Sequence, residues 1–310
     1  MQLSIVTTMY CSGQYVEEFY SRICAVAKSI TDNFEIIFVN DGSPDNALDL
    51  AIEIQKKDSK VKLIDLSRNF GHHKAMMTGL AHARGENIFL IDIDLEEEPE
   101  WLERFWHELN ESDHMDMVYG IQERRKGGFF ERSSGALFNI FFNLFSDVKL
   151  DNNQTVARLM SKRYVHSLLQ FTERELVFAG LCELTGYNQG SIFVQKGSKA
   201  SSTYNLFRKA ELAINYITSF SSKPLALIFY LGLVVTCAAS FFALKTLFIK
   251  IVYGIPVEGW TSIIISIWFL GGILMFSLGI LGIYLSKIFI EVKRRPYTII
   301  RAIYERDDEI

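Results

Sequence analysis

Two long stretches without a charged residue set the strongest limit on how this chain folds. Residues 225–244 and 261–286 contain only apolar, aromatic and small uncharged side chains. About 20 helical residues span the roughly 30 Å of hydrocarbon in a bilayer. Buried core helices are the alternative, but two such runs in succession disfavour it. The pattern predicts a hairpin of two transmembrane helices over residues 223–290, which also explains the positive mean hydropathy of +0.14.

Lysine and arginine are unevenly placed around these stretches. Lys223 precedes the first one, and a basic group follows the second, comprising Lys287, Lys293, Arg294 and Arg295. Because positive residues concentrate on the cytoplasmic side of membrane proteins, both chain ends are expected in the cytoplasm. Residues 203–222 predict an amphipathic helix lying on the membrane surface. Residues 291–310 are expected to form a cytosolic C-terminal tail.

Residues 1–202 have the pattern of an α/β domain. Short apolar runs rich in β-branched residues alternate with segments of helical periodicity. The predicted strands cover residues 3–8, 35–40, 61–65, 87–91 and 117–120, and the predicted helices cover 16–29, 47–57, 74–83 and 99–110. This alternation is typical of a Rossmann-like, mostly parallel sheet with helices on both faces.

Polar residues follow the ends of several predicted strands. Tyr10, Asp41, residues 67–69, Asp92 and Asp94 are expected to meet in one crevice, because ligands bind beyond the carboxyl ends of parallel strands. The chain contains neither GxGxxG after the first strand nor GxxxxGK[ST], which disfavours a dinucleotide redox enzyme and a P-loop NTPase. Each residue alone could belong to a turn or to packing. Together they predict a nucleotide site.

Three carboxylates alternate at the end of the fourth predicted strand, namely Asp92, Asp94 and Glu96. Carboxylates at the end of a buried strand require a cationic partner. Mg²⁺ or Mn²⁺ fits, because these ions prefer oxygen ligands and Mg²⁺ usually takes one or two carboxylates plus substrate phosphates. The alternative is that these acids open the next helix, whose N-terminus favours negative charge.

Four stretches together resemble the family 2 glycosyltransferases. They are Ile5–Tyr10, Phe38–Asp45, Leu66–His72 and Asp92–Glu96. With the two apolar runs they are most similar to the polyprenyl-phosphate branch, which includes dolichyl-phosphate mannose synthases and bactoprenol glycosyltransferases. The resemblance implies a GT-A fold, a nucleotide-sugar donor and inversion at the anomeric carbon. It also implies that the chain can form a homo-oligomer, such as a tetramer.

The resemblance implies roles for single residues as well. Asp41 would bind the base, Asp92 and Asp94 would handle the metal and the diphosphate, and Glu96 stands near the metal where relatives often have Gln. The nucleotide-binding set expected on this basis is Thr8, Tyr10, Asp41, Ser67, Arg68 and Asp92.

A basic, glycine-broken segment at 124–132 precedes the apolar residues 136–145. It could be a solvated loop leading into a helix. The resemblance favours a clamp for the acceptor phosphate, with Arg125, Arg132 and Ser134 as its ligands, because Arg binds phosphate in a bidentate manner. Gln122 departs from the family pattern, in which Arg is frequent at this position.

A second departure concerns the catalytic base. Relatives carry an Asp, proposed as the base, where this chain has Val156, and Asp151 is a weak substitute. A base is dispensable if the acceptor is a polyprenyl phosphate, because a phosphomonoester with a second pKa near 6 is mostly a dianion at neutral pH. The remaining task is to stabilise the leaving group, for which Asp94, Arg158 and Lys196 are the expected catalytic residues.

The sequence therefore predicts transfer of one sugar from a nucleotide sugar, with UDP-hexose as the expected donor, to undecaprenyl phosphate at the bacterial inner membrane. The product would serve surface polysaccharide assembly or modification. The departures keep open a non-catalytic membrane scaffold for a polysaccharide export system. A processive synthase is disfavoured, since Gln-x-x-Arg-Trp is not found. The net charge of −4 gives no sign of nucleic-acid binding.

Overall fold

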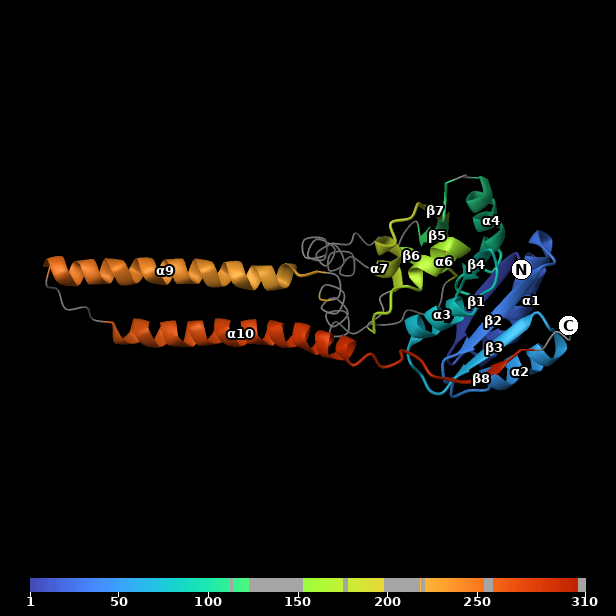
Figure 1. Ribbon diagram of the computed structural model, residues 1–310, viewed down its shortest axis with the longest axis horizontal. Coiled ribbons are helices and arrows are strands. Elements are labelled where there is room, and N and C mark those ends of the chain that lie inside the picture. Colours follow the sequence, from blue (N-terminus) through green and yellow to red (C-terminus); the bar gives the residue numbers. More distant parts are fainter. Residues whose placement is uncertain are drawn as a thin grey trace. The chain divides into compact units, whose positions relative to one another are not determined.

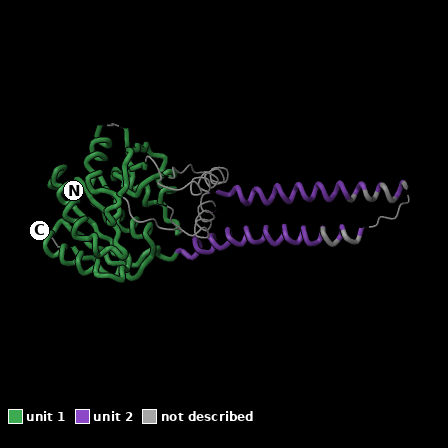
Figure 2. Tube along the Cα trace, turned by 180° about the vertical axis from the view of Figure 1, so that it is seen from behind, with its two compact units in different colours: residues 1–132, 148–203, 295–310 green, residues 133–147, 204–294 purple. Residues whose placement is uncertain are grey.

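The computed structural model describes residues 1–111, 114–122, 153–174, 178–197, 218, 221–253 and 259–305. The chain divides into two compact units (Figure 2). The first comprises residues 1–132, 148–203 and 295–310, and the second comprises residues 133–147 and 204–294. The predicted acceptor-phosphate residues Arg125, Arg132 and Ser134, and nearly all of the predicted amphipathic helix at 203–222, lie outside the described residues.

A single mixed sheet forms the centre of the first unit (Figure 1). Among the described residues its strand order is β7-β5-β6-β4-β1-β2-β3-β8. The strands are β1 (Leu3–Met9), β2 (Phe34–Asn40), β3 (Val61–Leu66), β4 (Asn87–Leu90), β5 (Met117–Gln122), β6 (Gln154–Ser161), β7 (Gln189–Val194) and β8 (Ile300–Tyr304).

Four neighbouring strands, β4, β1, β2 and β3, run parallel to one another. Leu3 of β1 pairs with Phe34 of β2 on one side and with Asn87 of β4 on the other. Every residue of β1, β2 and β3 is buried. Burial on both faces explains why these strands read as nearly continuous apolar runs in the sequence.

Helices cover both faces of the sheet, as predicted. They are α1 (Val16–Ile30), α2 (Ala47–Lys57), α3 (His72–Ala81), α4 (Trp101–Glu111), α6 (Lys162–Leu168) and α7 (Phe178–Leu184), with a 3-10 turn η1 (Gly13–Tyr15) before α1. Phe19 of α1 packs edge-on against Phe38 of β2, and Phe105 of α4 does the same against Phe89 of β4. The helix α3 packs on the opposite face through Gly79.

Three strands of the sheet were not predicted, namely β6, β7 and β8. Strand β7 pairs parallel with β5 at one edge of the sheet. Strand β6 inserts between β4 and β5 and runs antiparallel to both. Strand β8 comes from the expected C-terminal tail and pairs antiparallel with β3 at the edge of the sheet, with Leu63 opposite Tyr304. Ion pairs hold its end, because Glu305 contacts Lys62 at 3.0 Å and Arg84 at 2.7 Å. The last residues described therefore belong to the α/β domain.

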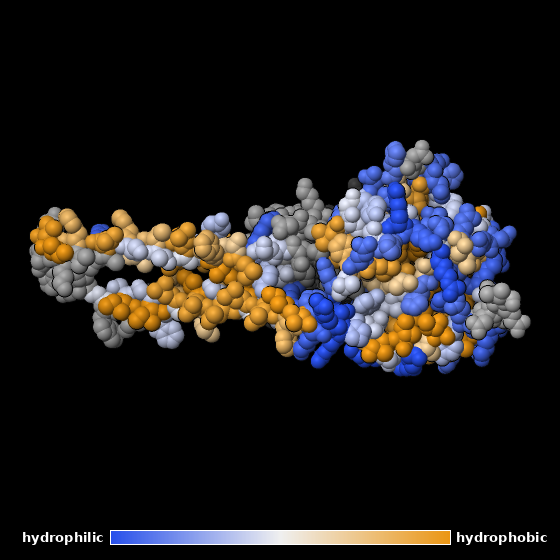
Figure 3. All heavy atoms as spheres, in the orientation of Figure 1, coloured by the Kyte–Doolittle hydropathy of each residue, from blue (hydrophilic) through white to orange (hydrophobic). Residues whose placement is uncertain are grey.

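The second unit contains two long helices, α9 (Lys223–Tyr253) and α10 (Trp260–Val292), which run side by side (Figures 1 and 2). Lys223–Phe242 and Ser266–Val292 are long and apolar enough to cross a membrane, and neither segment is buried. Figure 3 shows hydrophobic side chains along both helices. Exposed apolar helices of this length are consistent with the predicted membrane hairpin.

Gly79 gives a test of how α3 packs on the sheet. A Cβ at this position would lie 2.4 Å from Cγ1 of Val6 and 2.9 Å from Cγ2 of Val39. Gly79→Ala should lower the free energy of unfolding by about 1–3 kcal/mol through overpacking. Gly232→Ala on α9, where an added Cβ meets no atom within 4 Å, is the matched control. Equal melting temperatures in detergent for Gly79→Ala and the wild type would contradict this packing.

Glu305 predicts a pH dependence for the docking of β8. Partial burial raises the pKa of Glu305, but the hydrogen bond and charge of Lys62, together with Arg84, hold it below the ordinary 4.5. The ion pairs therefore stabilise the fold above this pH, and the contribution is lost as the pH falls through the lowered pKa. Glu305→Gln should cost up to about 1 kcal/mol at pH 7, and this cost should shrink as the pH falls below the ordinary pKa. Urea unfolding over a series of acidic pH values checks this, and a difference that does not shrink would contradict it.

Candidate active site

Four loops leave the parallel strands at the same edge of the sheet. They are residues 10–12 after β1, 41–45 after β2, 67–71 after β3 and 91–98 after β4. Because these strands are neighbours with the same direction, the loops meet where ligands bind in open α/β sheets. All predicted nucleotide-binding and metal-binding residues except Thr8 lie on these loops, and Thr8 lies within β1.

His72 joins the first and fourth strands. Its Nδ1 lies 3.0 Å from Oγ1 of Thr8, and its Nε2 lies 3.2 Å from Oδ1 of Asp92. Removal from water lowers the pKa of His72, but the hydrogen bond to Asp92 and the charges of Asp92, Glu97 and Asp41 outweigh this and raise it. The imidazole thus orients the Asp92 carboxylate. Sequence reasoning gave His72 no role, although it ends one of the stretches that carry the resemblance.

Asp41 holds the third loop. Its side chain is 2% exposed, and its oxygens accept hydrogen bonds from the backbone amides of Phe70 at 2.7 Å and Gly71 at 3.0 Å. Burial raises the pKa of Asp41 although these two hydrogen bonds oppose the change. The neighbouring Gly42 has φ +62°, and a Cβ there would lie 2.5 Å from the backbone of Arg68. The second and third loops are therefore in close backbone contact.

The first loop is tied to the second. The amide of Cys11 donates to Oγ of Ser43 at 2.7 Å, and the amide of Gly13 donates to Oδ2 of Asp45 at 2.8 Å. Cys11 adopts the left-handed conformation with φ +50°, which is uncommon for a residue with a side chain. Tyr10 is 51% exposed, so its ring is accessible to a planar ligand.

The fourth loop carries Asp94 and Glu96. The amide of Glu96 donates to Oδ1 of Asp94 at 3.1 Å, and Leu95 between them has φ +59°. Backbone strain of this kind collects at functional sites. Among the described residues, no group of three or more His, Cys, Asp or Glu side chains is arranged to hold a metal ion. Asp92 and Asp94 carry carboxylate oxygens, which are the type of ligand that Mg²⁺ and Mn²⁺ prefer.

Glu97 binds two further segments, the first half of β6 and the residues that follow β7. Its carboxylate is fully buried and accepts hydrogen bonds from the amides of Val156 at 2.8 Å and Ala157 at 2.7 Å. Nζ of Lys196 lies 2.8 Å from the same carboxylate. Burial lowers the pKa of Lys196, but Glu97 and the nearby acids of the fourth loop raise it above its usual value. Lys196 is thus held as a cation beside the Asp92–Glu96 segment.

Arg158 occupies a different environment from the one expected. Its side chain is 2% exposed and lies over the ring of Phe178, with its charged carbon 4.8 Å from the ring centre. Each guanidinium nitrogen donates within the domain, to the carbonyl oxygens of Val156 and Thr155 and to Sγ of Cys182. These contacts hold Arg158 between β6 and α7 and away from solvent, which argues against the catalytic role expected for it.

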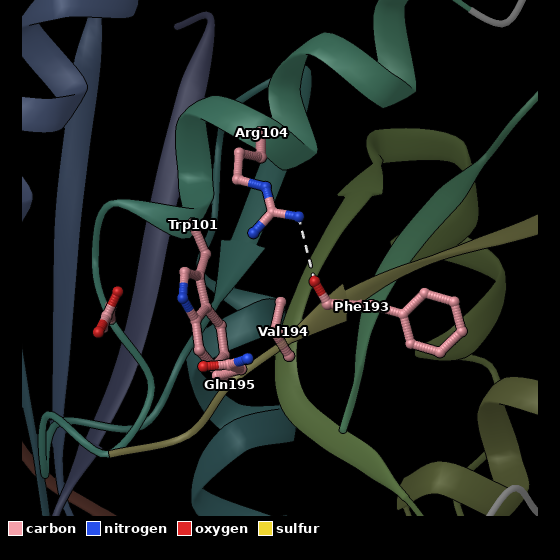
Figure 4. A pocket seen from close by; sticks show the side chains of 6 residues that line it. Trp101, Arg104, Phe193, Val194 and Gln195 are labelled. Atoms are coloured by element: carbon pink, nitrogen blue, oxygen red, sulfur yellow. Dashed lines mark hydrogen bonds between the residues drawn. The ribbon is translucent and has the colours of Figure 1, made fainter. Parts of the chain in front are cut away.

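An open pocket of about 390 Å³ lies beside the Lys196 segment, between α4 and the end of β7 (Figure 4). It is lined by Glu98, Trp101, Arg104, Phe193, Val194 and Gln195. A guanidinium nitrogen of Arg104 donates to the carbonyl oxygen of Phe193 at 3.1 Å, while the Phe193 ring points away from Trp101. Two of the lining residues, Glu98 and Gln195, are next to Glu97 and Lys196 in the sequence.

Comparison with known proteins identifies the family. The model of glycosyl transferase family 2 matches residues 4–169. A Mycobacterium tuberculosis protein named as a glycosyltransferase is 49% identical, over 99% of this chain and 90% of its own length. A bactoprenol glucosyl transferase of Shigella phage SfII is 30% identical, over 97% of this chain and 98% of its own.

A solved structure shares the fold. It is a mannosyltransferase from Pyrobaculum calidifontis, solved with GDP-mannose and Mn²⁺, with a TM-score of 0.50 and 14% identity over 70% of this chain and 63% of that one. The predicted GT-A fold is thereby confirmed. The family model matches more than half of the chain, and the relatives match it over nearly their full length. The protein is therefore a glycosyltransferase and belongs to glycosyl transferase family 2.

Proposed function

We propose that this glycosyltransferase moves one sugar, with inversion, from a nucleotide sugar to undecaprenyl phosphate. The expected donor is a UDP-hexose, and the product is a polyprenyl monophosphosugar for surface polysaccharide assembly or modification. The observation that carries the proposal is the chain of contacts from Thr8 through His72 to Asp92, which joins the nucleotide loops to the acidic loop. Full-length relatives named bactoprenol glucosyl transferase support the choice of acceptor.

The nucleoside would lie over the first three loops. In this proposal the exposed ring of Tyr10 stacks on the base. Asp41 holds the third loop in place, and a remaining lone pair of its carboxylate accepts a hydrogen bond from the base. Ser67 and Arg68 line the other side. Arg68 is stacked on Phe70, with its charged carbon 4.2 Å from the ring centre, so its cationic group is already oriented.

The diphosphate would lie against the acidic loop. Asp92 and Asp94, with Glu96 beside them, would hold Mg²⁺ or Mn²⁺, and the ion would neutralise charge on the departing nucleoside diphosphate. The structural relative solved with Mn²⁺ supports a divalent ion. Lys196, held by Glu97, would add a second positive charge at the leaving group. His72 keeps the Asp92 carboxylate in one orientation.

The acceptor requires little activation. The phosphate of a polyprenyl phosphate is mostly a dianion at neutral pH, so its oxygen can attack the anomeric carbon without losing a proton. This fits Val156, whose side chain has no acid or base and whose amide is used by Glu97. Arg125, Arg132 and Ser134 remain the proposed ligands of the acceptor phosphate. Positioning of the two substrates then supplies the main rate enhancement.

The membrane hairpin suits a lipid acceptor. Strand β8 follows α10 and pairs with β3 in the same sheet, so residues before α9 and after α10 must lie on one side of any bilayer that the helices cross. This supports an even number of spans. With the basic residues after the second span, the proposal places the catalytic domain and both termini in the cytoplasm at the bacterial inner membrane, with a homo-oligomer as a further expectation.

Asp94 tests the catalytic proposal. Asp94→Asn removes a charged ligand of the proposed metal and should lower the turnover rate at least about 100-fold. The assay measures UDP released from UDP-glucose with a short polyprenyl phosphate and Mg²⁺ or Mn²⁺, and EDTA should abolish it. Glu108→Gln on the exposed side of α4 is the control and should keep full activity. A folded Asp94→Asn protein with normal turnover would contradict the assignment and favour a scaffold.

Glu97 tests the anchor of the Lys196 segment. Gln offers one acceptor oxygen where Glu97 satisfies two backbone amides and an ammonium group, so Glu97→Gln leaves buried donors unpaired. We expect a loss of about 2–4 kcal/mol in the free energy of unfolding. The exposed neighbour Glu98 provides the matched variant Glu98→Gln, which should change little. Unfolding of both variants in detergent checks this, and equal stability would contradict the anchoring role.

A further inference from the structure

Arg301 on β8 reaches the edge where the four loops meet. One guanidinium nitrogen lies 2.6 Å from the carbonyl oxygen of Ser67, and another lies 3.2 Å from Oδ2 of Asp65. The amide of Ser67 donates to the carbonyl oxygen of Ile299 at 2.9 Å. Both backbone polar groups of Ser67 are therefore bound by the segment that follows α10.

The contact continues through the sheet. Asp65 is 1% exposed, and its Oδ1 accepts from the side-chain amide of Asn40 at 2.7 Å. Oδ1 of Asn40 in turn accepts from the amide of Ser43 at 3.1 Å, and Ser43 binds the amide of Cys11. This series of hydrogen bonds links β8 to the second and first loops. Arg301 supplies the positive charge for the buried carboxylate at its start, which would otherwise be costly.

We propose that Arg301 is a positioning residue of the donor site. It holds Ser67 and, through Asp65 and Asn40, the loop that begins at Asp41, in the arrangement that binds the nucleotide. The C-terminal strand β8 then contributes to donor binding through Arg301, in addition to forming an edge of the sheet. The inference rests on the proposed function for its link to the donor, while its structural part concerns the loops themselves.

The chain offers a matched control for this residue. Arg84 also contacts the end of the C-terminal strand, through Glu305 at 2.7 Å. It lies just before β4, at the end of the parallel strands opposite to the four loops. Arg84→Ala therefore removes an arginine contact with the same segment without touching Ser67 or Asp65. It should leave the kinetics for the donor unchanged.

The test compares Arg301→Ala, Arg301→Lys and Arg84→Ala with the wild type as full-length proteins in nanodiscs. Arg301→Ala should raise the KM for UDP-glucose about tenfold or more, since it removes hydrogen bonds from a charged group. The turnover rate at saturating donor and the KM for polyprenyl phosphate should change less than about twofold, as expected for lost donor binding. Arg301→Lys should restore part of the affinity, because one ammonium cannot replace both contacts.

A second readout does not depend on turnover. Hydrogen exchange at the amides of residues 67–71 and 41–45 should be faster in Arg301→Ala than in the wild type and in Arg84→Ala. If the wild type is active and Arg301→Ala has an unchanged KM for UDP-glucose, the inference is wrong while the proposed function stands. Equal hydrogen exchange in these loops in Arg301→Ala and the wild type would have the same meaning. An equal loss for both substrates, with a lower melting temperature, also overturns it. A wild type that uses no sugar nucleotide overturns the proposed function and the link to the donor together.

Discussion

Hydrogen bonds between β4, β1, β2 and β3 run in parallel register, and the placement of the whole candidate site follows from them. Because the strands share a direction, four loops that are distant in sequence leave the sheet at one edge. Both faces of these strands are buried, and the loops at this end carry the polar residues of the candidate site. The loops that carry Tyr10, Asp41, Ser67 and Asp92 thus leave the sheet at one end, although no motif joins these residues in sequence.

Buried carboxylates connect the loops at this edge. Asp41, Asp65 and Glu97 are each almost fully buried, and each uses both of its oxygens to bind groups from other elements. An unpaired charge in such a place would be costly, but a carboxylate can satisfy several donors at once. The result is a set of short loops joined to other elements through side-chain hydrogen bonds. Fixed dipoles and charges of this kind suit a site that must stabilise a departing anion.

The sequence predicted the α/β order, the apolar helices and the loops that meet, since hydrophobic period and strand ends are local signals. It assigned Arg158 to the leaving group, but a buried cation above Phe178 is a tertiary arrangement that spacing cannot reveal. The same holds for His72 and Glu97, whose roles depend on contacts between separate elements. Strand β8 was missed because an edge strand after a basic segment has only a weak pattern.

The pairing of β3 with β8 has a consequence for how the protein is made. Ser67 and Arg301 are 234 positions apart, and both long helices lie between them. While the ribosome is still making those helices, β3 presents a row of unpaired backbone groups, which is a hazard for aggregation. Contacts of such high sequence separation also form slowly. The backbone groups of β3 on this side therefore gain their partner strand only after both long helices have been synthesised.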